Sequence, residues 1–540
     1  MAGVVSRCVC RVSVPVPEQP TRSALGGSAM LFDAEAADRA AFDRLFDVCV
    51  VGAGPAGITL ARSLAAQGFT VALMEAGGFD YDPVSQDVYA GECGGHDYFP
   101  LDECRLRFFG GTSGHWDGKC RPLAARDFLP HKTNPMSGWA IRKADLDPYL
   151  TPAARILDLD DPIVPPDLPL TQTEDRFRHV QWHYSAPTRF GEKYRDEIVA
   201  SDRISLCLNA NLVDLTLGDD QSRVVGAWFR NYDPDDRGFA VRARSYALCL
   251  GGIENARMLL NFRSQRPNGI GNHHDLVGRY FCEHPTVFAA DMLLTETWPF
   301  EQQVFAPTED LLDRAQVSSF AVFVEPQRRE TPLDLPKALK TTAECLTPEV
   351  SQLVQRLRGY RPRCGWGGLE EFALVRHPKE NPWAKVAVSV EQRLNAESRV
   401  HLAEGADQFG LKRIRICWNL KDKDYDTFRA AVTAFGAHVA EQNVGRLRLR
   451  PWIRAEEPML PSPGGTDGQV AGRHHMGTTR MCNNARTGVV NADCRLHEVD
   501  NLYLGGSSVF STGGYTKPTL TIVQLALRLG DHMGETLRAA

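Results

Sequence analysis

The sequence predicts an α/β fold with at least two domains, and three observations support this prediction. A buried strand, a glycine-rich turn, a helix and a second strand follow one another within residues 46–75. A further strand, double glycine and helix occupy 247–260, and another glycine-rich turn precedes a helix at 522–533. Units of this kind build a parallel sheet covered by helices. Alternating apolar segments between them predict an antiparallel sheet.

Length and composition set the class of protein. A chain of 540 residues is too long for one simple core, so interlocked domains are expected. Hydrophobic residues make up 43% and charged residues 24%, which is typical of soluble globular proteins. The net charge of −6 gives no electrostatic reason for a nucleic-acid partner, and no apolar run approaches the roughly 18 residues of a membrane-spanning helix. Fourteen cysteines without regular spacing favour a reducing, cytoplasmic location.

Residues 1–40 do not show the pattern of a folded domain. The first 30 residues carry Arg7, Arg11 and Arg22 among prolines, without the continuous apolar stretch of a secretory signal. We therefore expect residues 1–40 to form a disordered tail, or translation to start at Met30.

The first glycine turn has the form G-x-G-x-x-G in the context that a dinucleotide site needs. The strand at 46–51 leads into Gly52, which permits a tight turn, and Gly54 lets the backbone approach a pyrophosphate. Gly57 lets the helix pack closely on the strand. Glu75 ends the next strand and suits a carboxylate that accepts hydrogen bonds from ribose hydroxyls. The unit predicts dinucleotide binding, with FAD and NAD(P) both open at this point.

Two later segments are suited to contact a bulky ligand. A run of five small residues at 110–114 precedes His115 and Trp116, so the backbone can pass close to something flat, although an ordinary glycine-rich loop is the alternative. Near the C-terminal end, a loop starting at His474 leads to a short strand and a Gly/Ser/Thr turn before the helix at 522–533. Such a turn aims backbone N–H groups at anionic or electron-rich groups.

The middle of the chain predicts a second domain. Residues 136–199 predict a mostly helical excursion with a proline-stiffened linker at 162–169. Alternating segments between 204 and 250 predict an antiparallel insertion. Residues 286–461 predict a separate sheet covered by helices. Its clearest elements are two strands and a helix, at 386–390, 411–416 and 424–443.

With these pieces in this order, the chain resembles the glucose-methanol-choline (GMC) oxidoreductase family. The matching segments are 47–77, 109–123, 247–260, 391–410 and 474–533. The resemblance implies a Rossmann-like domain of the p-hydroxybenzoate-hydroxylase type that binds FAD and not NAD(P). It also implies a substrate domain with an antiparallel sheet and helices. The implied boundaries are 41–135, 200–285 and 462–540 for the FAD-binding domain, and 136–199 with 286–461 for the substrate-binding domain.

The resemblance also implies roles for single residues. The ADP half of FAD would contact Gly52, Gly54, Ala56, Gly57 and Glu75, with Val213 by the adenine. The flavin would be lined by Gly110, Gly111, Thr112 and Ser113, with Gly506 and Ser507 near the pyrophosphate and Pro518 and Thr519 at the pyrimidine edge. His115 matches the position of a covalent flavin link in some sugar oxidases of the family, and a non-covalent histidine packed by the ring is the alternative.

The implied reaction is oxidation of a CH–OH group to aldehyde or ketone by hydride transfer to flavin N5. His474 takes the family's base position, where a neutral imidazole suits removal of the hydroxyl proton, and a backbone-bonded structural histidine is the alternative. His475 is expected to be structural. The sequence departs from the family at Lys517, where Asn or His is usual. Lys517 either hydrogen-bonds the substrate oxygen or points away to solvent or a carboxylate.

The implied substrate is a small, sugar-like alcohol. Segments 110–116 and 506–510 resemble bacterial family members that act on sugar-like alcohols, some of which oxidise amino sugars in aminoglycoside antibiotic biosynthesis. Glu370 and Glu371 are a possible source of carboxylates for a cationic substrate, although a surface pair is the commoner explanation. Oxygen or another acceptor would reoxidise the flavin, and no compact ligand set predicts a metal site. Two alternatives stay open: an NAD(P)-dependent dehydrogenase, and a flavoprotein of this fold without alcohol oxidase activity.

Overall fold

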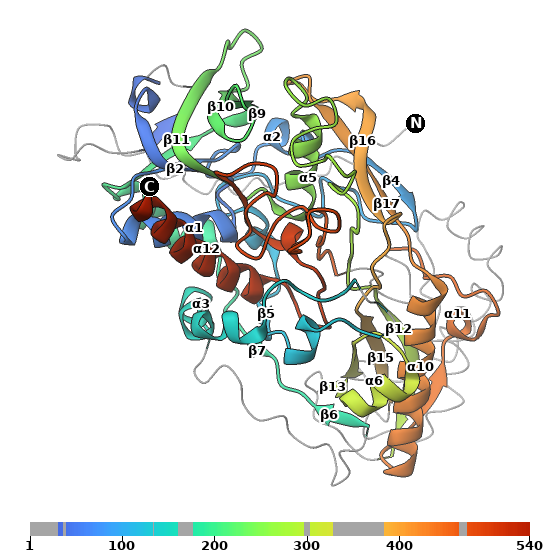
Figure 1. Ribbon diagram of the computed structural model, residues 1–540. Coiled ribbons are helices and arrows are strands. Elements are labelled where there is room, and N and C mark those ends of the chain that lie inside the picture. Colours follow the sequence, from blue (N-terminus) through green and yellow to red (C-terminus); the bar gives the residue numbers. More distant parts are fainter. Residues whose placement is uncertain are drawn as a thin grey trace, which may run out of the picture.

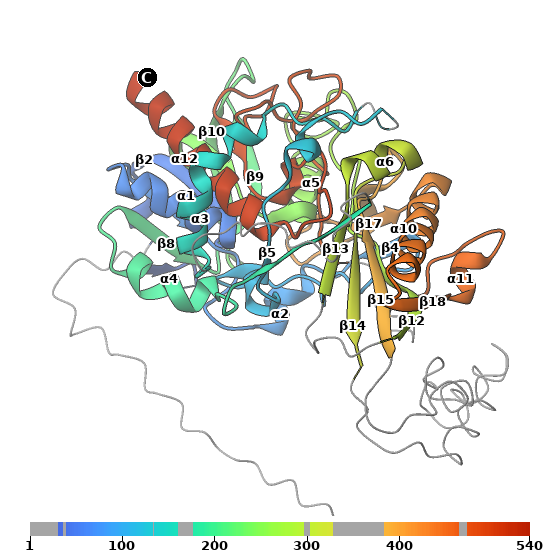
Figure 2. The same ribbon diagram turned by 90° about the horizontal axis from the view of Figure 1, so that it is seen from below.

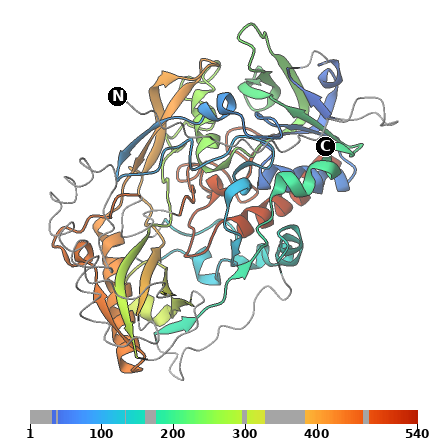
Figure 3. The same cartoon turned by 180° about the vertical axis from the view of Figure 1, so that it is seen from behind.

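The computed structural model describes residues 31–35, 39–132, 134, 136–159, 176–295, 303–327, 383–463 and 472–540. The first 30 residues, the predicted linker at 162–169, and Glu370 with Glu371 lie outside these ranges. Figures 1 and 3 show the described part from opposite sides, with a larger body around β2, β11 and α12 and a smaller one around β15 and α10.

The larger body is built on an eight-stranded sheet with the order β1-β8-β3-β2-β11-β10-β9, in which β19 also pairs with β11. Its strands are β1 (Leu31–Asp33), β2 (Leu45–Val51), β3 (Val71–Met74), β8 (Ile204–Leu208), β9 (Asn211–Leu217), β10 (Val224–Arg230), β11 (Phe239–Leu248) and β19 (Leu502–Leu504). Strands β1, β8, β3, β2, β11 and β19 pair in parallel, whereas β9, β10 and β11 form an antiparallel meander. The parallel core confirms the predicted α/β class.

Two strands correct the prediction. Strand β8 was expected in the antiparallel insertion, but it pairs in parallel with β3. All five of its residues are buried, which is typical of a strand covered on both faces. Strand β1 lies inside the predicted 1–40 tail and pairs with β8 at the sheet edge. Its three residues are too few to show a period in the sequence.

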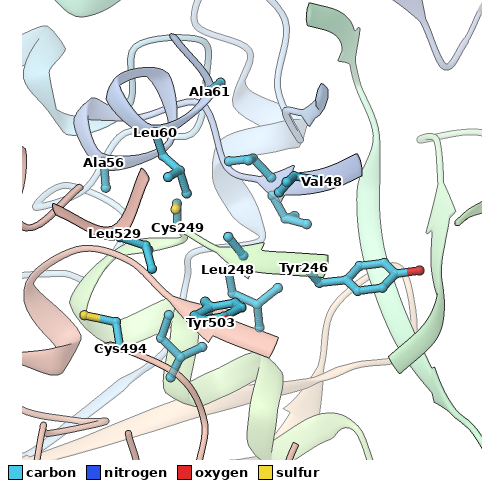
Figure 4. Close-up of a cluster of buried hydrophobic side chains, with 14 of the residues drawn as sticks. Val48, Ala56, Leu60, Ala61, Tyr246, Leu248, Cys249, Cys494, Tyr503 and Leu529 are labelled. Atoms are coloured by element: carbon cyan, nitrogen blue, oxygen red, sulfur yellow. The ribbon is translucent and has the colours of Figure 1, made fainter. Parts of the chain in front are cut away.

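Five helices belong to the larger body, and α1 and α4 pack on strands of its sheet. The five are α1 (Pro55–Ala66), α3 (Leu150–Ile156), α4 (Phe190–Val199), α5 (Gly251–Asn261) and α12 (Thr519–Ala539). Helix α1 lies against α12, and Figure 4 shows Leu60 of α1 in one buried cluster with Leu248 of β11 and Tyr503 of β19. Gly52 has a φ of +98°, and a Cβ on Gly57 would lie 1.8 Å from the Gly52 carbonyl oxygen. Both positions therefore require glycine.

The smaller body is a six-stranded antiparallel sheet with the order β18-β12-β15-β14-β13-β6. Its strands are β6 (Phe177–His179), β12 (Thr286–Leu294), β13 (Gln303–Pro307), β14 (Phe320–Pro326), β15 (Trp383–Val390) and β18 (Gly445–Leu449). Helices α6 (Glu309–Ala315), α10 (Asp422–Glu441) and α11 (Pro451–Arg454) accompany it, and α10 lies against the sheet in Figure 2. Helix α10 buries Phe428, Val432, Phe435 and Val439, which share one helical face.

A small sheet joins the two bodies. Strand β16 (Arg399–Ala406) pairs with β17 (Lys412–Trp418), and β17 pairs in parallel with β4 (Glu92–Gly95). Helix α5 of the larger body packs on β16. The remaining short elements are α2 (Pro83–Asp87), β5 (Lys119–Cys120) and β7 (His183–Tyr184). Segments from both predicted domains share this sheet, and the domain boundaries stay a prediction.

Candidate active site

A cavity of ≈ 410 Å³ lies beside the glycine turn and is lined by segments far apart in the sequence. Most of the predicted site residues line it: Gly52, Gly54, Ala56, Glu75, Gly111, Thr112, Ser113, His115, His474, Gly506, Ser507, Lys517, Pro518 and Thr519. Residues near the start of the chain and residues near its end thus form one wall. The fold brings them together because β2 and β19 both pair with β11.

Three predicted residues do not line this cavity. Gly57 lies in α1, where it packs against the Gly52 carbonyl. Gly110 has a φ of +96°, and a Cβ there would meet the Gly191 backbone nitrogen at 2.4 Å. Val213 follows the lining residues Ala210 and Leu212, and side chains alternate along β9. Close backbone packing therefore explains why Gly57 and Gly110 are needed as glycines outside the cavity. The alternation of side chains along β9 explains why Val213 does not line it.

Three helices begin at the cavity, which is the feature that best fits an anionic cofactor. The N-terminal residues of α1, α5 and α12 all line it. Helix N-termini carry free N–H groups and a partial positive charge that favour phosphate. Cβ atoms on Gly54 and Gly251 would meet no other atom within 4 Å, so the backbone there is open to a ligand. These residues fit the pyrophosphate of a dinucleotide.

Glu75 is held by the glycine turn itself. Its two carboxylate oxygens accept hydrogen bonds from Ala53 N–H at 2.8 Å and from Gly77 N–H at 2.9 Å. Burial raises its pKa, while these bonds and Arg107 act in the opposite direction. A carboxylate can accept further bonds, so Glu75 can brace the turn and still contact a ribose.

His474 and Lys517 are the two candidate catalytic side chains, and both are half-buried in the wall of the same cavity. Burial lowers the pKa of His474 well below its usual value, and the Lys517 ammonium adds to this effect. His474 is therefore a neutral imidazole at physiological pH, as a base must be.

Lys517 itself has an unusual position for a lysine. Within the described ranges, its ammonium makes no hydrogen bond or ion pair. Burial lowers its pKa, Asp117 and Glu283 oppose the shift, and Lys119 adds to it. The side chain thus faces the cavity with hydrogen-bond donors that are available to a ligand.

Three residues behind His474 were not predicted from the sequence. His284 is 1% exposed, and its Nδ1 lies 2.8 Å from Nδ1 of His474. The neighbouring Glu283 accepts hydrogen bonds from the Tyr98 hydroxyl and from the His284 backbone N–H. Burial raises the pKa of Glu283 to about 7. The only local feature in the sequence is that His284 stands between Glu283 and Pro285, and this does not predict the contacts.

Two other histidines lie nearby. His475 is 8% exposed, stacks on Phe281 and lies 3.6 Å from the Cys104 sulfur, which suits the predicted structural role. His115 lines the cavity and is open to it. Partial burial lowers the pKa of His115, and the positive charges of Arg473 and Arg189 lower it further.

The fold and the cavity define an α/β protein with a site at three helix N-termini that fits a nucleotide cofactor. Residues 395–526 match the family model described as GMC oxidoreductase. This match confirms the resemblance to GMC oxidoreductases and, with it, FAD as the cofactor. The NAD(P)-dependent alternative has no support from these comparisons.

Relatives with assigned activities match almost the whole chain at low identity. 6'''-Hydroxyparomomycin C oxidase of Streptomyces lividus is 23% identical over 92% of this chain and 93% of its own. Paromamine 6'-oxidase of Streptomyces fradiae is 24% identical over 90% and 91%. The fructose dehydrogenase large subunit of Gluconobacter japonicus is 22% identical over 91% and 98%. The similar proteins thus include sugar and alcohol oxidases and dehydrogenases.

Solved structures confirm the fold. Pyridoxine 4-oxidase from Mesorbium loti has a TM-score of 0.56 at 15% identity, covering 90% of this chain and 99% of that one. Formate oxidase from Aspergillus oryzae has a TM-score of 0.52 at 15% identity, covering 92% and 99%. In the described part of the chain, no helix has the length and apolar character needed to cross a membrane.

Proposed function

We propose that the protein oxidises the CH–OH group of a sugar-like alcohol to an aldehyde or ketone. The observation that carries the proposal is that His474 and Lys517 line the same cavity as the three helix N-termini. FAD bound there would supply the hydride acceptor. His474 takes the hydroxyl proton as general base, and Lys517 holds the substrate oxygen.

The charges in the cavity wall support these two roles. A neutral His474 can accept a proton, and its lowered pKa keeps it available at and below neutral pH. The Lys517 ammonium can donate to the oxygen as negative charge develops on it, and a charge-assisted hydrogen bond is stronger than a neutral one. The alternative in which Lys517 points away to solvent is disfavoured by its place in the wall.

The substrate class follows from the relatives and is limited by the charges. The two Streptomyces relatives carry the names of oxidases of amino-sugar compounds, which favours an amino sugar here, and with it a role in aminoglycoside antibiotic biosynthesis. The wall carries the basic side chains of Arg105, Arg107, Arg473 and Lys517, against the carboxylates of Glu75, Asp117 and Glu254. Asp117 is the carboxylate with the largest effect on the pKa of Lys517. An amino sugar bound beside Lys517 would therefore have to direct its ammonium groups toward Asp117, while a neutral sugar has no such constraint.

The test is anaerobic reduction of the bound flavin by a panel of alcohols. The panel contains neutral hexoses and polyols, paromamine and paromomycin, and the loss of flavin absorbance is followed. At least one sugar-like alcohol is expected to bleach the flavin, and failure of all of them would contradict the proposal. His474→Ala with the same flavin content is expected to react about 10²-fold more slowly or worse.

The same samples identify the electron acceptor. Oxygen is admitted after bleaching, and return of the flavin colour with formation of hydrogen peroxide would assign an oxidase. Colour that returns only with an added dye would assign a dehydrogenase. A cytoplasmic location is part of the proposal and is supported by the cysteine pattern alone.

A further inference from the structure

His284 contacts His474 but does not line the cavity. The two residues are 190 positions apart, and their rings meet edge to face with centroids 5.0 Å apart and planes at 74°. His284 comes just before β12, near the end of the segment 200–285 of the predicted FAD-binding domain, whereas His474 belongs to the C-terminal segment of that predicted domain. Because buried polar groups are hydrogen-bonded, one of the two Nδ1 atoms must donate and the other must accept.

The position of the protons follows from a backbone carbonyl. Nε2 of His284 lies 3.0 Å from the carbonyl oxygen of Gly514, which can only accept, so this nitrogen carries a proton. A neutral imidazole has a single N–H, and Nδ1 of His284 is therefore an acceptor. Nδ1 of His474, at 2.8 Å, must then be the donor. Nε2 of His474 is left with a free lone pair.

The surroundings hold His284 neutral and hold the carbonyl in place. Burial, with the Lys517 charge, lowers the pKa of His284 to about 3. Gly514 has a φ of +55°, and its N–H donates to Glu391 Oε1 at 3.3 Å. A Cβ on Gly513 would lie 2.7 Å from His284 Nε2, so glycine is needed for the ring to reach the carbonyl.

The other ionisable groups facing this pair come from several segments. Glu283 accepts from the His284 backbone at 3.0 Å, and Lys517 and His475 lower the pKa of His474. Asp127 lies against Gly514, where a Cβ would meet its Oδ2 at 2.7 Å. None of these groups forms a hydrogen bond with a ring nitrogen of His284 among the described residues. Its tautomer therefore follows from the Gly514 carbonyl, and the Gly513 backbone acts in the same direction.

We propose that His284 is a positioning residue that holds His474 in the tautomer whose Nε2 can take the substrate's hydroxyl proton. The proposal rests on the proposed function of His474 as base. In the step, the substrate O–H bond breaks and its proton forms the Nε2–H bond of His474. The resulting imidazolium keeps its Nδ1–H bond to His284, so the base needs no reorientation when it becomes charged.

The tautomer is measured by NMR on FAD-loaded protein with ¹⁵N-labelled histidine rings. The His474 signals are those lost in His474→Ala. We expect a protonated Nδ1 and an unprotonated Nε2 in the wild type. His284→Asn keeps an acceptor near the Nδ1 position and should keep this pattern. His284→Gln reaches toward the Gly514 carbonyl but removes that acceptor, so a mixture of tautomers is expected. An unchanged His474 pattern in His284→Gln would overturn the proposal.

Flavin reduction by the alcohol is measured with the same variants. We expect His284→Gln to be slower by about 10-fold or more, because a wrongly held tautomer disables a histidine base, whereas His284→Asn should stay within about threefold. The control is His438→Leu, which removes another buried histidine, in α10 of the smaller body. Equal rates for His284→Gln and the wild type, with His474→Ala slow, would overturn the positioning role. A fast His474→Ala would instead refute the proposed function, and NMR would still decide the tautomer.

Discussion

At residue 517 a lysine stands where a GMC oxidoreductase is expected to have asparagine or histidine, and this exchange changes the electrostatics of the site. An ammonium lowers the pKa of a neighbouring imidazole because two cations repel each other. It can also stabilise an alkoxide more strongly than an amide can. In the proposed reaction, the lysine therefore favours a neutral His474 and stabilises negative charge on the substrate oxygen.

The first prediction concerns the oxygen contact. Lys517→Ala is expected to slow flavin reduction by about 10²-fold, in the range found when one oxyanion donor is removed. Lys517→Asn restores a donor and should retain much of the rate. Single-turnover reduction in stopped flow measures both, with the exposed Lys412→Ala as control. Wild-type speed in Lys517→Ala would show that His474 works with another partner.

The second prediction concerns pH. The folded pKa of His474 is lowered, so its base form persists as pH falls below the usual histidine range. Lys517→Met removes the cation and should raise this pKa. The rate of flavin reduction is then expected to fall at a higher pH than in the wild type. Profiles that coincide on the acid side would argue against the coupling between the two side chains.

The third prediction concerns His115. Its open position in the cavity wall is compatible with a flavin contact, and we expect that contact to be non-covalent. Acid precipitation should give a yellow supernatant and a colourless pellet. A yellow pellet that turns colourless in His115→Ala would instead establish a covalent bond at this residue.

At the scale of elements, the glycine turn has two separable functions. Gly57 lets α1 pack against β2, since a Cβ there would lie 1.8 Å from a carbonyl oxygen. Gly54 lies at the cavity, where a Cβ would meet no protein atom within 4 Å. One glycine therefore serves packing, and the other serves access to the ligand.

This difference gives the fourth prediction. Gly57→Ala is expected to lower the melting temperature of the flavin-free protein by several degrees or to prevent folding, because the backbone must shift. Gly54→Ala should leave that temperature within about 2 °C but weaken FAD binding by about 10-fold or more, since the methyl group enters the cofactor's space. Thermal unfolding and FAD titration measure the two effects. Equal loss of stability in both variants would contradict the separation.

At the scale of the whole molecule, a pair of buried carboxyl groups connects three distant segments. Asp127 is 2% exposed and belongs to a 3-10 helix, Ala125–Phe128, whereas Glu391 is 4% exposed and follows β15. Both meet the C-terminal segment at Gly514. Burial, followed by the charge of Glu391, raises the pKa of Asp127 to about 7, and burial raises that of Glu391 to about 7.

The fifth prediction is a pH dependence of stability. Unfolded carboxyl groups titrate near pH 4, so between about pH 4 and 7 the folded protein holds protons that the unfolded chain has released. The pair therefore lowers the free energy of unfolding as pH rises through this window. Glu391→Gln is expected to make the melting temperature fall less steeply between pH 5 and 8. The surface variant Glu397→Gln is the control, and an unchanged slope in Glu391→Gln would refute the assignment.

Local patterns in the sequence determined the elements that carry the cofactor site. The turn at Gly52, the strand before it and the helix after it follow from apolar periodicity and from glycine at positions that only glycine tolerates. The same holds for α10, which was predicted within two residues at each end, and for α12, which extends three residues before and six residues beyond the predicted 522–533. These features are local, so neighbouring residues in the chain are enough to specify them.

The tertiary structure alone decided which side chains meet. His284 and His474 are 190 residues apart, and neither segment carries a local sign of the other. Asp127 lies in a 3-10 helix and Glu391 follows β15, far away in the chain. Strand β8 is parallel because of partners distant in the chain. Hydrogen bonds between such residues depend on three-dimensional packing, which a single sequence does not encode in its spacing. The sequence by itself therefore determined the kind of site, and the folded chain decided which side chains contact His474.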